Sequence, residues 1–289
     1  MDRQNEPKLN PSHTPQAMGL RNRLRIKAKE VLIPRLVYWG WHPPHGTPPS
    51  TPVGGRPFGY DEEGVIREAA RRVSAHTMTT FERLATLWQQ VRYLDRYGIP
   101  GALVECGVWN GGSSAMMALA HMFSSTTPQR ELHLFDSFEG LPEPRSDKDG
   151  SEAVSYAANR ANGSLVSIQE CVGALEENRD LLQHSIKYPP ELLHYHVGWF
   201  ENTVPTSAPT MPQIALLRLD GDWYESTRVC LQHLYPHVVR GGVVVVDDYG
   251  HWQGCRSAVD EFVHSLDEPV LLNHIDYSGR YWIRLCNAS

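Results

Sequence analysis

The chain has 289 residues, of which 41% are hydrophobic and 21% are charged, so it is long enough for one large or two small globular domains with a full core. Its net charge of −6 gives no general attraction to nucleic acid or an anionic membrane, and no apolar run approaches the roughly 18 residues of a membrane span. Five scattered cysteines without a CxxC pair, and an N-terminus without the apolar core of a secretory signal, lead us to expect a reducing, cytoplasmic location without disulfides or a cysteine zinc site.

The first 57 residues hold ten of the 21 prolines, which predicts irregular structure over residues 1–16 and 42–57. Between them, residues 20–38 set Arg21, Arg23, Arg25, Lys27 and Lys29 among leucines, as in a basic amphipathic helix. Such a helix could contact a membrane or a partner, but the acidic chain favours packing on its own domain. We therefore predict an N-terminal extension over residues 1–60, which could serve as a lid, and one main domain over residues 61–289.

A regular pattern begins near residue 79. Apolar residues with helical spacing over 84–94 predict a helix that Thr79 or Thr80 caps and that the run Gly98-Ile99-Pro100-Gly101 ends. Strands are predicted over 102–106, 131–135, 192–197, 214–219 and 243–246, and helices over 113–123, 165–182, 226–235 and 254–265. Two more strands, 270–274 and 281–285, close the chain. This alternation predicts a doubly wound α/β fold, with a mostly parallel sheet, helices on both faces and an antiparallel C-terminal end.

Paired carboxylates follow two of these strands. Asp220 and Asp222 come after strand 214–219, and Asp247 and Asp248 come after strand 243–246. Because the carboxyl ends of parallel strands meet at one edge of a sheet, we expect these side chains to converge there. Helix capping accounts for one aspartate per strand but not for two. The cluster therefore predicts a site for Mg²⁺, Mn²⁺ or Ca²⁺. The 14 histidines show no metal-binding spacing and are interpreted as surface or packing residues.

A glycine-rich turn follows the first strand. Glu105 precedes Gly107 and Gly111 in a pattern that matches neither GxGxxG nor a phosphate-binding loop. An acidic residue here would repel a pyrophosphate but suit an ammonium group, such as that of S-adenosylmethionine. Asp136, at the tip of the next strand, is placed to bind ribose hydroxyls, and Phe138 could lie against adenine, although an aspartate alone is as often a helix cap. Together these residues favour an adenosyl ligand over a simple tight turn.

These segments in combination resemble the macrocin O-methyltransferase family, whose members methylate sugar hydroxyls of macrolides and aminocoumarins. The resemblance covers roughly residues 75–285 and rests on Thr77-Met78 and on residues 104–113, 135–142, 198–205, 219–227 and 241–249. Asn202 departs from it by standing where aspartate is frequent, and residues 1–60 have no counterpart in the family.

The resemblance implies an S-adenosylmethionine-dependent methyltransferase (Rossmann-like) domain over residues 61–289. It implies that Asp220, Asp247 and Asp248 bind Mg²⁺ and that Asp222 is the general base. The residues it implies for S-adenosylmethionine are Thr77, Met78, Glu105, Cys106, Gly107, Val108, Trp109, Asp136, Ser137, Phe138, Glu139, Gly140 and Trp199.

The expected reaction is Mg²⁺-dependent methyl transfer to a sugar hydroxyl, of a deoxysugar by preference, on a glycosylated natural product of antibiotic biosynthesis. Three aspartates leave room on a six-coordinate Mg²⁺ for two substrate hydroxyls and a water, so a vicinal diol is the natural acceptor. Trp223, Tyr224 and Tyr249 could stack on the sugar or serve as packing residues. We also expect a homodimer or a higher homo-oligomer, with no nucleic-acid partner.

Three other functions remain open from the sequence. A methyltransferase of phenols or catechols would use the same metal chemistry. The sequence Asp220-Gly221-Asp222 is also the DxD motif of many glycosyltransferases, but that function leaves Glu105 and the glycine turn unexplained. A non-enzymatic adenosyl-binding or partner-binding protein would not need the metal set.

Overall fold

The structure is a computed structural model that describes residues 62–125, 129–157, 167–168 and 170–286. The predicted extension over residues 1–60, with its basic helix over residues 20–38, lies outside the described residues. No helix within the described ranges is long and apolar enough to cross a membrane.

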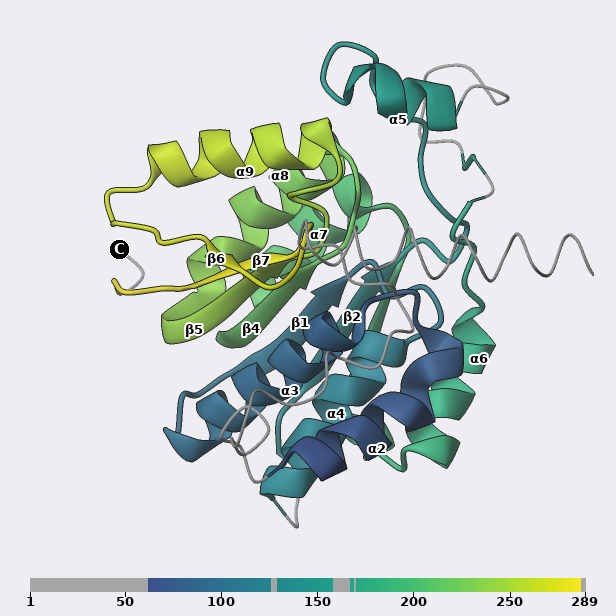
Figure 1. Ribbon diagram of the computed structural model, residues 1–289, viewed down its shortest axis with the longest axis vertical. Helices are drawn as coiled ribbons and strands as arrows, with labels where there is room; N and C mark the ends of the chain where they lie inside the picture. Colours follow the sequence, from purple (N-terminus) through teal and green to yellow (C-terminus); the bar gives the residue numbers. More distant parts are fainter. Residues whose placement is uncertain (1–61, 126–128, 158–166, 169, 287–289) are drawn as a thin grey trace, which may run out of the picture. The chain divides into compact units, whose positions relative to one another are not determined.

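Seven strands of the described chain form one sheet in the order β3-β2-β1-β4-β5-β7-β6 (Figure 1). They are β1 (Ala102–Cys106), β2 (Leu132–Asp136), β3 (Leu193–Val197), β4 (Ile214–Leu219), β5 (Val238–Val246), β6 (Asn273–His274) and β7 (Arg280–Ile283). Strands β1 to β5 pair in parallel, whereas β7 is antiparallel to both β5 and β6. The predicted doubly wound sheet with an antiparallel C-terminal end is confirmed.

Strands β1 and β4 have the predicted bounds because each is an apolar run that is buried along its whole length. Strand β5 begins five residues before its predicted start at residue 243. The pairing of β4 with β5 shifts register where Gly241 and Gly242 lie, and Gly241 has a φ of +83°, which side chains disfavour. The two glycines therefore mark an irregularity inside a strand rather than its start.

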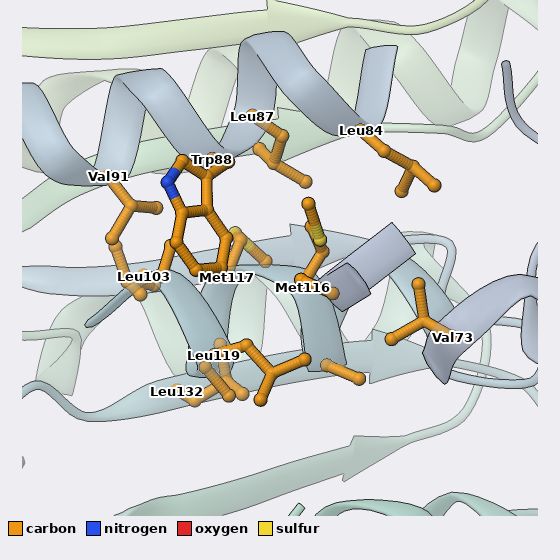
Figure 2. Packing of buried hydrophobic residues seen from close by; sticks show 14 of the residues in the cluster. Val73, Leu84, Leu87, Trp88, Val91, Leu103, Met116, Met117, Leu119 and Leu132 are labelled. Carbon is orange, nitrogen blue, oxygen red and sulfur yellow. The ribbon is translucent and has the colours of Figure 1, made fainter. Parts of the chain in front are cut away.

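Helices cover both faces of the sheet (Figure 1). Helices α2 (Glu63–Val73), α3 (Phe81–Arg96) and α4 (Gly112–Ser124) pack on one face, and α7 (Phe200–Ser207), α8 (Tyr224–Leu234) and α9 (Gln253–Ser265) pack on the other. Figure 2 shows the α3 side chains Leu84, Leu87 and Trp88 pointing toward Met116 and Met117 of α4. All five are buried, and each is worth about 1.5–3 kcal/mol relative to an exposed position.

Helix α3 begins and ends as predicted. The Thr80 hydroxyl accepts a hydrogen bond from the Arg83 backbone N–H at 3.3 Å, which satisfies one of the free donors of the first turn. The helix ends at Arg96, and Gly98 follows with a φ of +61°. Because its cap places Arg83 in the first turn, this helix delivers a guanidinium group to the carboxyl edge of the sheet.

Three helices were not predicted: α2, α7 and the short α5 (Gly150–Tyr156). The buried face of α2 includes Ala69 and Ala70, which give a weak hydrophobic signal, and α7 contains Pro205, which disfavours a helix interior.

The helix predicted over residues 165–182 is wrong in its first half. Among the described residues of this range, only those of α6 (Leu175–Arg179) and of the π-helical turn Asp180–Ser185 are helical. The backbone of Ile168 bonds to Leu141 at 2.8 Å, and a side chain at Gly173 would collide with the Trp109 carbonyl. The described residues Ile168 and Gly173 thus lie against the loops that follow β2 and β1.

Candidate active site

A cavity of about 520 Å³ lies at the carboxyl edge of the sheet, bordered by the residues that follow β1, β2, β4 and β5. In the strand order, β1 stands where the chain turns from one half of the sheet to the other, which is where open α/β sheets bind ligands. The volume of the cavity suits a small molecule. The segments predicted to carry chemistry therefore meet around one space.

Three aspartates converge in this cavity as predicted. Asp220, Asp247 and Asp248 each place a carboxylate oxygen within 4.8 Å of the others. The Asp220 N–H bonds to the Cys106 carbonyl at 2.8 Å, and the Asp247 N–H bonds to that of Leu219 at 2.9 Å, so the sheet ladder continues past the strand ends and fixes both residues. Burial first, and the neighbouring carboxylates next, raise the pKa of Asp248 well above its usual value.

Two arginines that the sequence analysis did not identify hold these carboxylates. Arg218 lies on β4 and is buried, and it donates to Glu105 at 2.7 Å, Asp220 at 2.9 Å and Asp247 at 2.8 Å. Arg83 of α3 pairs with Asp247 and, at 2.8 Å, with Asp276. An arginine inside an apolar strand such as Arg218 gives little warning of this role, because two of its three partners, Glu105 and Asp247, come from distant segments.

The site carries an excess of negative charge. Six acidic residues surround the two guanidinium groups of Arg83 and Arg218, and they are Glu105, Asp220, Asp222, Asp247, Asp248 and Asp276. These six carboxylates and two cations leave four negative charges uncompensated when all are ionised. Because unpaired buried charge is costly, the set favours either protonation or an added cation. Accordingly, burial raises the pKa of Glu105 to about 7, although Arg218 opposes the shift.

Asp222 is not one of the three converging aspartates but lies next to them. Its backbone has a φ of +58°, a left-handed conformation that residues other than glycine rarely adopt. Its side chain accepts a hydrogen bond from the Trp252 indole N–H at 2.6 Å, and its own N–H donates to Asp248 at 3.2 Å. Burial, followed by repulsion from Asp220, raises its pKa to about 7. Asp222 is thus a carboxylate in the cavity that titrates near neutrality and is oriented by an indole.

Most residues predicted to bind S-adenosylmethionine line the cavity. These are Thr77, Met78, Glu105, Gly107, Val108, Trp109, Asp136, Ser137, Gly140 and Trp199. Three others, Cys106, Phe138 and Glu139, are not among its lining residues. The Cys106 side chain instead lies in the apolar core on the α8 side of the sheet.

Gly107 brings the glycine-rich turn that follows β1 against the turn that follows β4 and holds Asp220. Its φ is +90°, and a Cβ there would lie 1.8 Å from the Asp220 carbonyl oxygen. No larger residue fits unless one turn moves. The absence of a side chain therefore sets the close spacing between the two halves of the cavity.

Asp136 and Glu105 already have protein partners. Asp136 accepts the N–H groups of Val108 at 2.7 Å, Trp109 at 3.0 Å and Phe138 at 2.7 Å. A carboxylate has about four acceptor positions, so roughly one remains for a ribose hydroxyl. Glu105 is buried and bonded to Arg218 and to the Ser114 hydroxyl. Both residues shape the turn, and their direct contact with a cofactor stays a prediction.

The aromatic residues that face the cavity differ from those singled out in the sequence. Trp223 is buried and donates to the Pro142 carbonyl at 2.8 Å, while Tyr224 and Tyr249 bond to Glu261 and Asp260. None of the three lines the cavity, so they are packing residues. The aromatic lining comes from Trp109, Tyr156, Trp199, Phe200, His251 and Trp252.

Comparisons with known proteins identify the family to which the chain is similar. The model of the macrocin O-methyltransferase family (TylF) matches residues 57–284. Demethyldecarbamoylnovobiocin O-methyltransferase of Streptomyces niveus is 38% identical over 211 residues, which cover 73% of this chain and 76% of that protein. The 8-demethyl-8-(2,3-dimethoxy-α-L-rhamnosyl)-tetracenomycin-C 4′-O-methyltransferase of Streptomyces olivaceus is 38% identical over 212 residues, 72% of this chain and 75% of that protein.

Solved structures show the same fold. The O-methyltransferase NovP superposes with a TM-score of 0.64 at 34% identity and covers 73% of this chain and 83% of its own. The calicheamicin methyltransferase CalS11 superposes with a TM-score of 0.55 at 18% identity over 98% of this chain and 99% of its own.

Proposed function

The chain belongs to the macrocin O-methyltransferase family, and from this premise we propose that it transfers the methyl group of S-adenosylmethionine to a sugar hydroxyl, with Mg²⁺ bound by Asp220, Asp247 and Asp248. The observation that carries the proposal is the convergence of these three carboxylates beside Asp222 in a cavity that the glycine turn also lines. Membership of a methyltransferase family sets aside the glycosyltransferase and non-enzymatic alternatives.

The donor set fits Mg²⁺. All three groups are carboxylates, the ligand type that Mg²⁺ prefers, and a divalent cation would offset part of the excess negative charge. Among the described residues, the arginine ion pairs engage one oxygen of Asp220 and none of Asp248, whereas both oxygens of Asp247 pair with arginines. Arg83 and Arg218 would hold Asp247 in place from both sides.

Methyl transfer to a sugar hydroxyl needs a proton acceptor and a fixed nucleophile, because the hydroxyl is a very weak acid. S-adenosylmethionine supplies an electrophilic methyl group, and Mg²⁺ supplies Lewis acidity that lowers the pKa of a hydroxyl it binds. Asp222 is placed to accept the proton at its carboxylate, and the Trp252 indole keeps that carboxylate facing the cavity. Because Gly107 has no side chain, the turn that follows β1 can lie close to the turn of Asp220, so that the two substrates can meet.

The acceptor class follows from the cavity wall and from the relatives. Tyr156, Trp199 and Trp252 line the cavity, and aromatic rings are the side chains that commonly cover the apolar face of a sugar. The two curated relatives above are named for a demethyldecarbamoylnovobiocin and a rhamnosyl-tetracenomycin substrate. We therefore propose a glycosylated small molecule, whose sugar has vicinal hydroxyls, over a free phenol or catechol.

An acceptor panel tests this proposal. The full-length protein is incubated with methyl-labelled S-adenosylmethionine and matched glycosylated and phenolic acceptors, with Mg²⁺ or with EDTA. Label should enter the sugar of a glycosylated acceptor only when Mg²⁺ is present. Label on a phenolic hydroxyl of an unglycosylated acceptor would support the catechol-type alternative instead.

Three further expectations belong to the same proposal. A cytoplasmic location is proposed from the scattered cysteines without a CxxC pair, which suit a reducing compartment. A homodimer or higher oligomer is tested by light scattering of the purified chain. Deleting residues 1–60, and measuring affinity for the acceptor, tests whether that extension acts as a lid.

A further inference from the structure

A second group of potential metal ligands lies far along the strands from the aspartates. Glu131, His133 and His194 each place one ligand atom within 4.8 Å of the others. Glu131 and His133 stand at the start of β2, and His194 stands near the start of β3, so this histidine cluster lies toward the amino ends of strands whose carboxyl ends border the cavity.

Sheet register explains why these residues meet. His133 and His194 are direct partners across the parallel β2–β3 pair, so their side chains leave the same face of the sheet. Their rings stack with centroids 4.6 Å apart. No spacing within one segment reveals the group, because His133 and His194 come from two strands and are 61 residues apart in the sequence. The fold thus groups two histidines that no spacing in the sequence groups.

One imidazole nitrogen of the cluster lacks a partner. His194 Nε2 is shielded from solvent and has no hydrogen bond to any described residue. It faces Glu131 Oε2 at 3.9 Å, too far for a hydrogen bond, while His133 Nε2 lies 3.0 Å from the same oxygen. A shielded nitrogen that points at a carboxylate without bonding to it leaves room for an ion between them.

From this geometry we propose that Glu131, His133 and His194 form a binding site for a divalent transition metal of the zinc class. Two imidazoles and one carboxylate suit Zn²⁺ and exclude a preference for Mg²⁺. In a tetrahedral zinc site with bonds of about 2.0–2.1 Å, neighbouring ligand atoms lie about 3.3 Å apart. The two separations in the cluster, 3.0 and 3.9 Å, bracket that value. The fourth position is open for water.

Hydrogen bonds behind His133 would orient its metal-binding side. His133 Nδ1 lies 3.0 Å from His196 Nε2, and His196 Nδ1 lies 3.0 Å from the Ser207 hydroxyl of α7. With a metal on His133 Nε2, the proton of that ring resides on Nδ1 and is donated to His196, which in turn donates its Nδ1 proton to Ser207. This is the outward hydrogen bond by which metal-binding histidines are usually oriented. Without a metal, the same chain runs the opposite way and ends on Glu131.

Zinc at this position would join an edge strand to its neighbour. Strand β3 is at the end of the sheet and is only half-buried, with the His194 side chain 38% exposed. The metal would tie β3 to β2 without entering the cavity. We therefore expect it to stabilise the fold and to leave methyl transfer unchanged.

Calorimetric titration of Zn²⁺ tests the proposal. The full-length protein is first stripped with EDTA and then held in saturating Mg²⁺, so that the acidic site is filled. Removing an outer hydrogen-bond partner of a zinc ligand weakens binding by about 10–100-fold, so His196→Ala should show that loss and His194→Ala at least as large a one. His264→Ala, which removes an exposed histidine at the end of α9, is the matched control and should bind as the wild type does.

Folding of the variants is checked by thermal unfolding without zinc. Glu131 and His194 are 43% and 38% exposed, so Glu131→Gln and His194→Ala should keep the wild-type midpoint. Zinc should raise the midpoint of the wild type and not that of either variant. Equal zinc affinity in wild type and His194→Ala, or zinc binding that is lost in Asp248→Asn and retained in His194→Ala, would overturn the proposal.

Discussion

Replacing Asp222 with asparagine should lower the rate of methyl transfer and at the same time stabilise the metal-free fold. Asparagine keeps the shape and an oxygen that accepts the Trp252 indole N–H, so the contact at 2.6 Å survives. It cannot accept a proton at neutral pH. We expect kcat at saturating Mg²⁺ and substrates to fall by about 10²–10⁴-fold, the usual effect of a positioned base, while metal and cofactor affinity stay unchanged.

The stability gain follows from the sign of the pKa shift. The pKa of Asp222 is about 7 in the fold and about 3.9 in an unfolded chain, so the native state binds more protons between these values. The fold is therefore destabilised as pH rises through this window, because the buried Asp222 carboxyl loses its proton. The variant has no such loss. Because the cavity admits water, we expect a gain of about 1 kcal/mol at pH 7.5 and little at pH 4.

Two assays follow the two effects. Steady-state kinetics gives kcat, and thermal unfolding in EDTA at both pH values gives the stability. Asp260→Asn, on the outer side of α9, is a control that removes a carboxylate outside the cavity. A rate loss below about threefold, which is less than 1 kcal/mol of barrier, would reassign Asp222 to a packing role. A lower midpoint for the variant at pH 7.5 would refute the electrostatic reasoning.

Three other outcomes are expected. Arg218→Met should lower the free energy of unfolding by about 3–5 kcal/mol, because it leaves the carboxylates of Glu105 and Asp247 without this cation. An unchanged midpoint of unfolding in denaturant would contradict the assigned ion pairs. Asp136→Ala should weaken S-adenosylmethionine binding, as measured by calorimetry. It should also destabilise the protein by about 1–3 kcal/mol, because three backbone N–H donors lose their acceptor. A loss of stability without a loss of affinity would make Asp136 purely structural. The metal-free protein should lose stability as pH rises from about 4.5 to 7, the window set by the raised pKa of Glu105, and a flat calorimetric profile would argue against that shift.

Much of the sheet could be predicted because its strands are apolar runs with clear ends. Strands β1 and β4 have their predicted bounds, and the cap and buried face of α3 follow from Thr80 and the helical spacing of its leucines. The convergence of Asp220, Asp247 and Asp248 followed from one rule about the edges of parallel sheets.

The rest depends on contacts that no local pattern reports. Arg218 sits in an apolar strand, and only the fold shows that it links carboxylates from β1, β4 and β5. The sequence does not show which aromatic residues line the cavity. Trp223 is buried against Pro142, while Trp252, 29 residues later, lines the cavity. Likewise, the histidine cluster depends on the register of β2 and β3, which the sequence does not specify.

The central claim is that three converging aspartates bind the Mg²⁺ on which methyl transfer depends. The most direct test is calorimetric titration of Mg²⁺ into wild-type protein and Asp248→Asn, together with the methyl-transfer rate of each. The wild type should bind about one Mg²⁺ per chain and lose activity in EDTA, and the variant should keep its fold but lose both binding and turnover. Full activity of the wild type in EDTA, or wild-type Mg²⁺ affinity in Asp248→Asn, would contradict the claim.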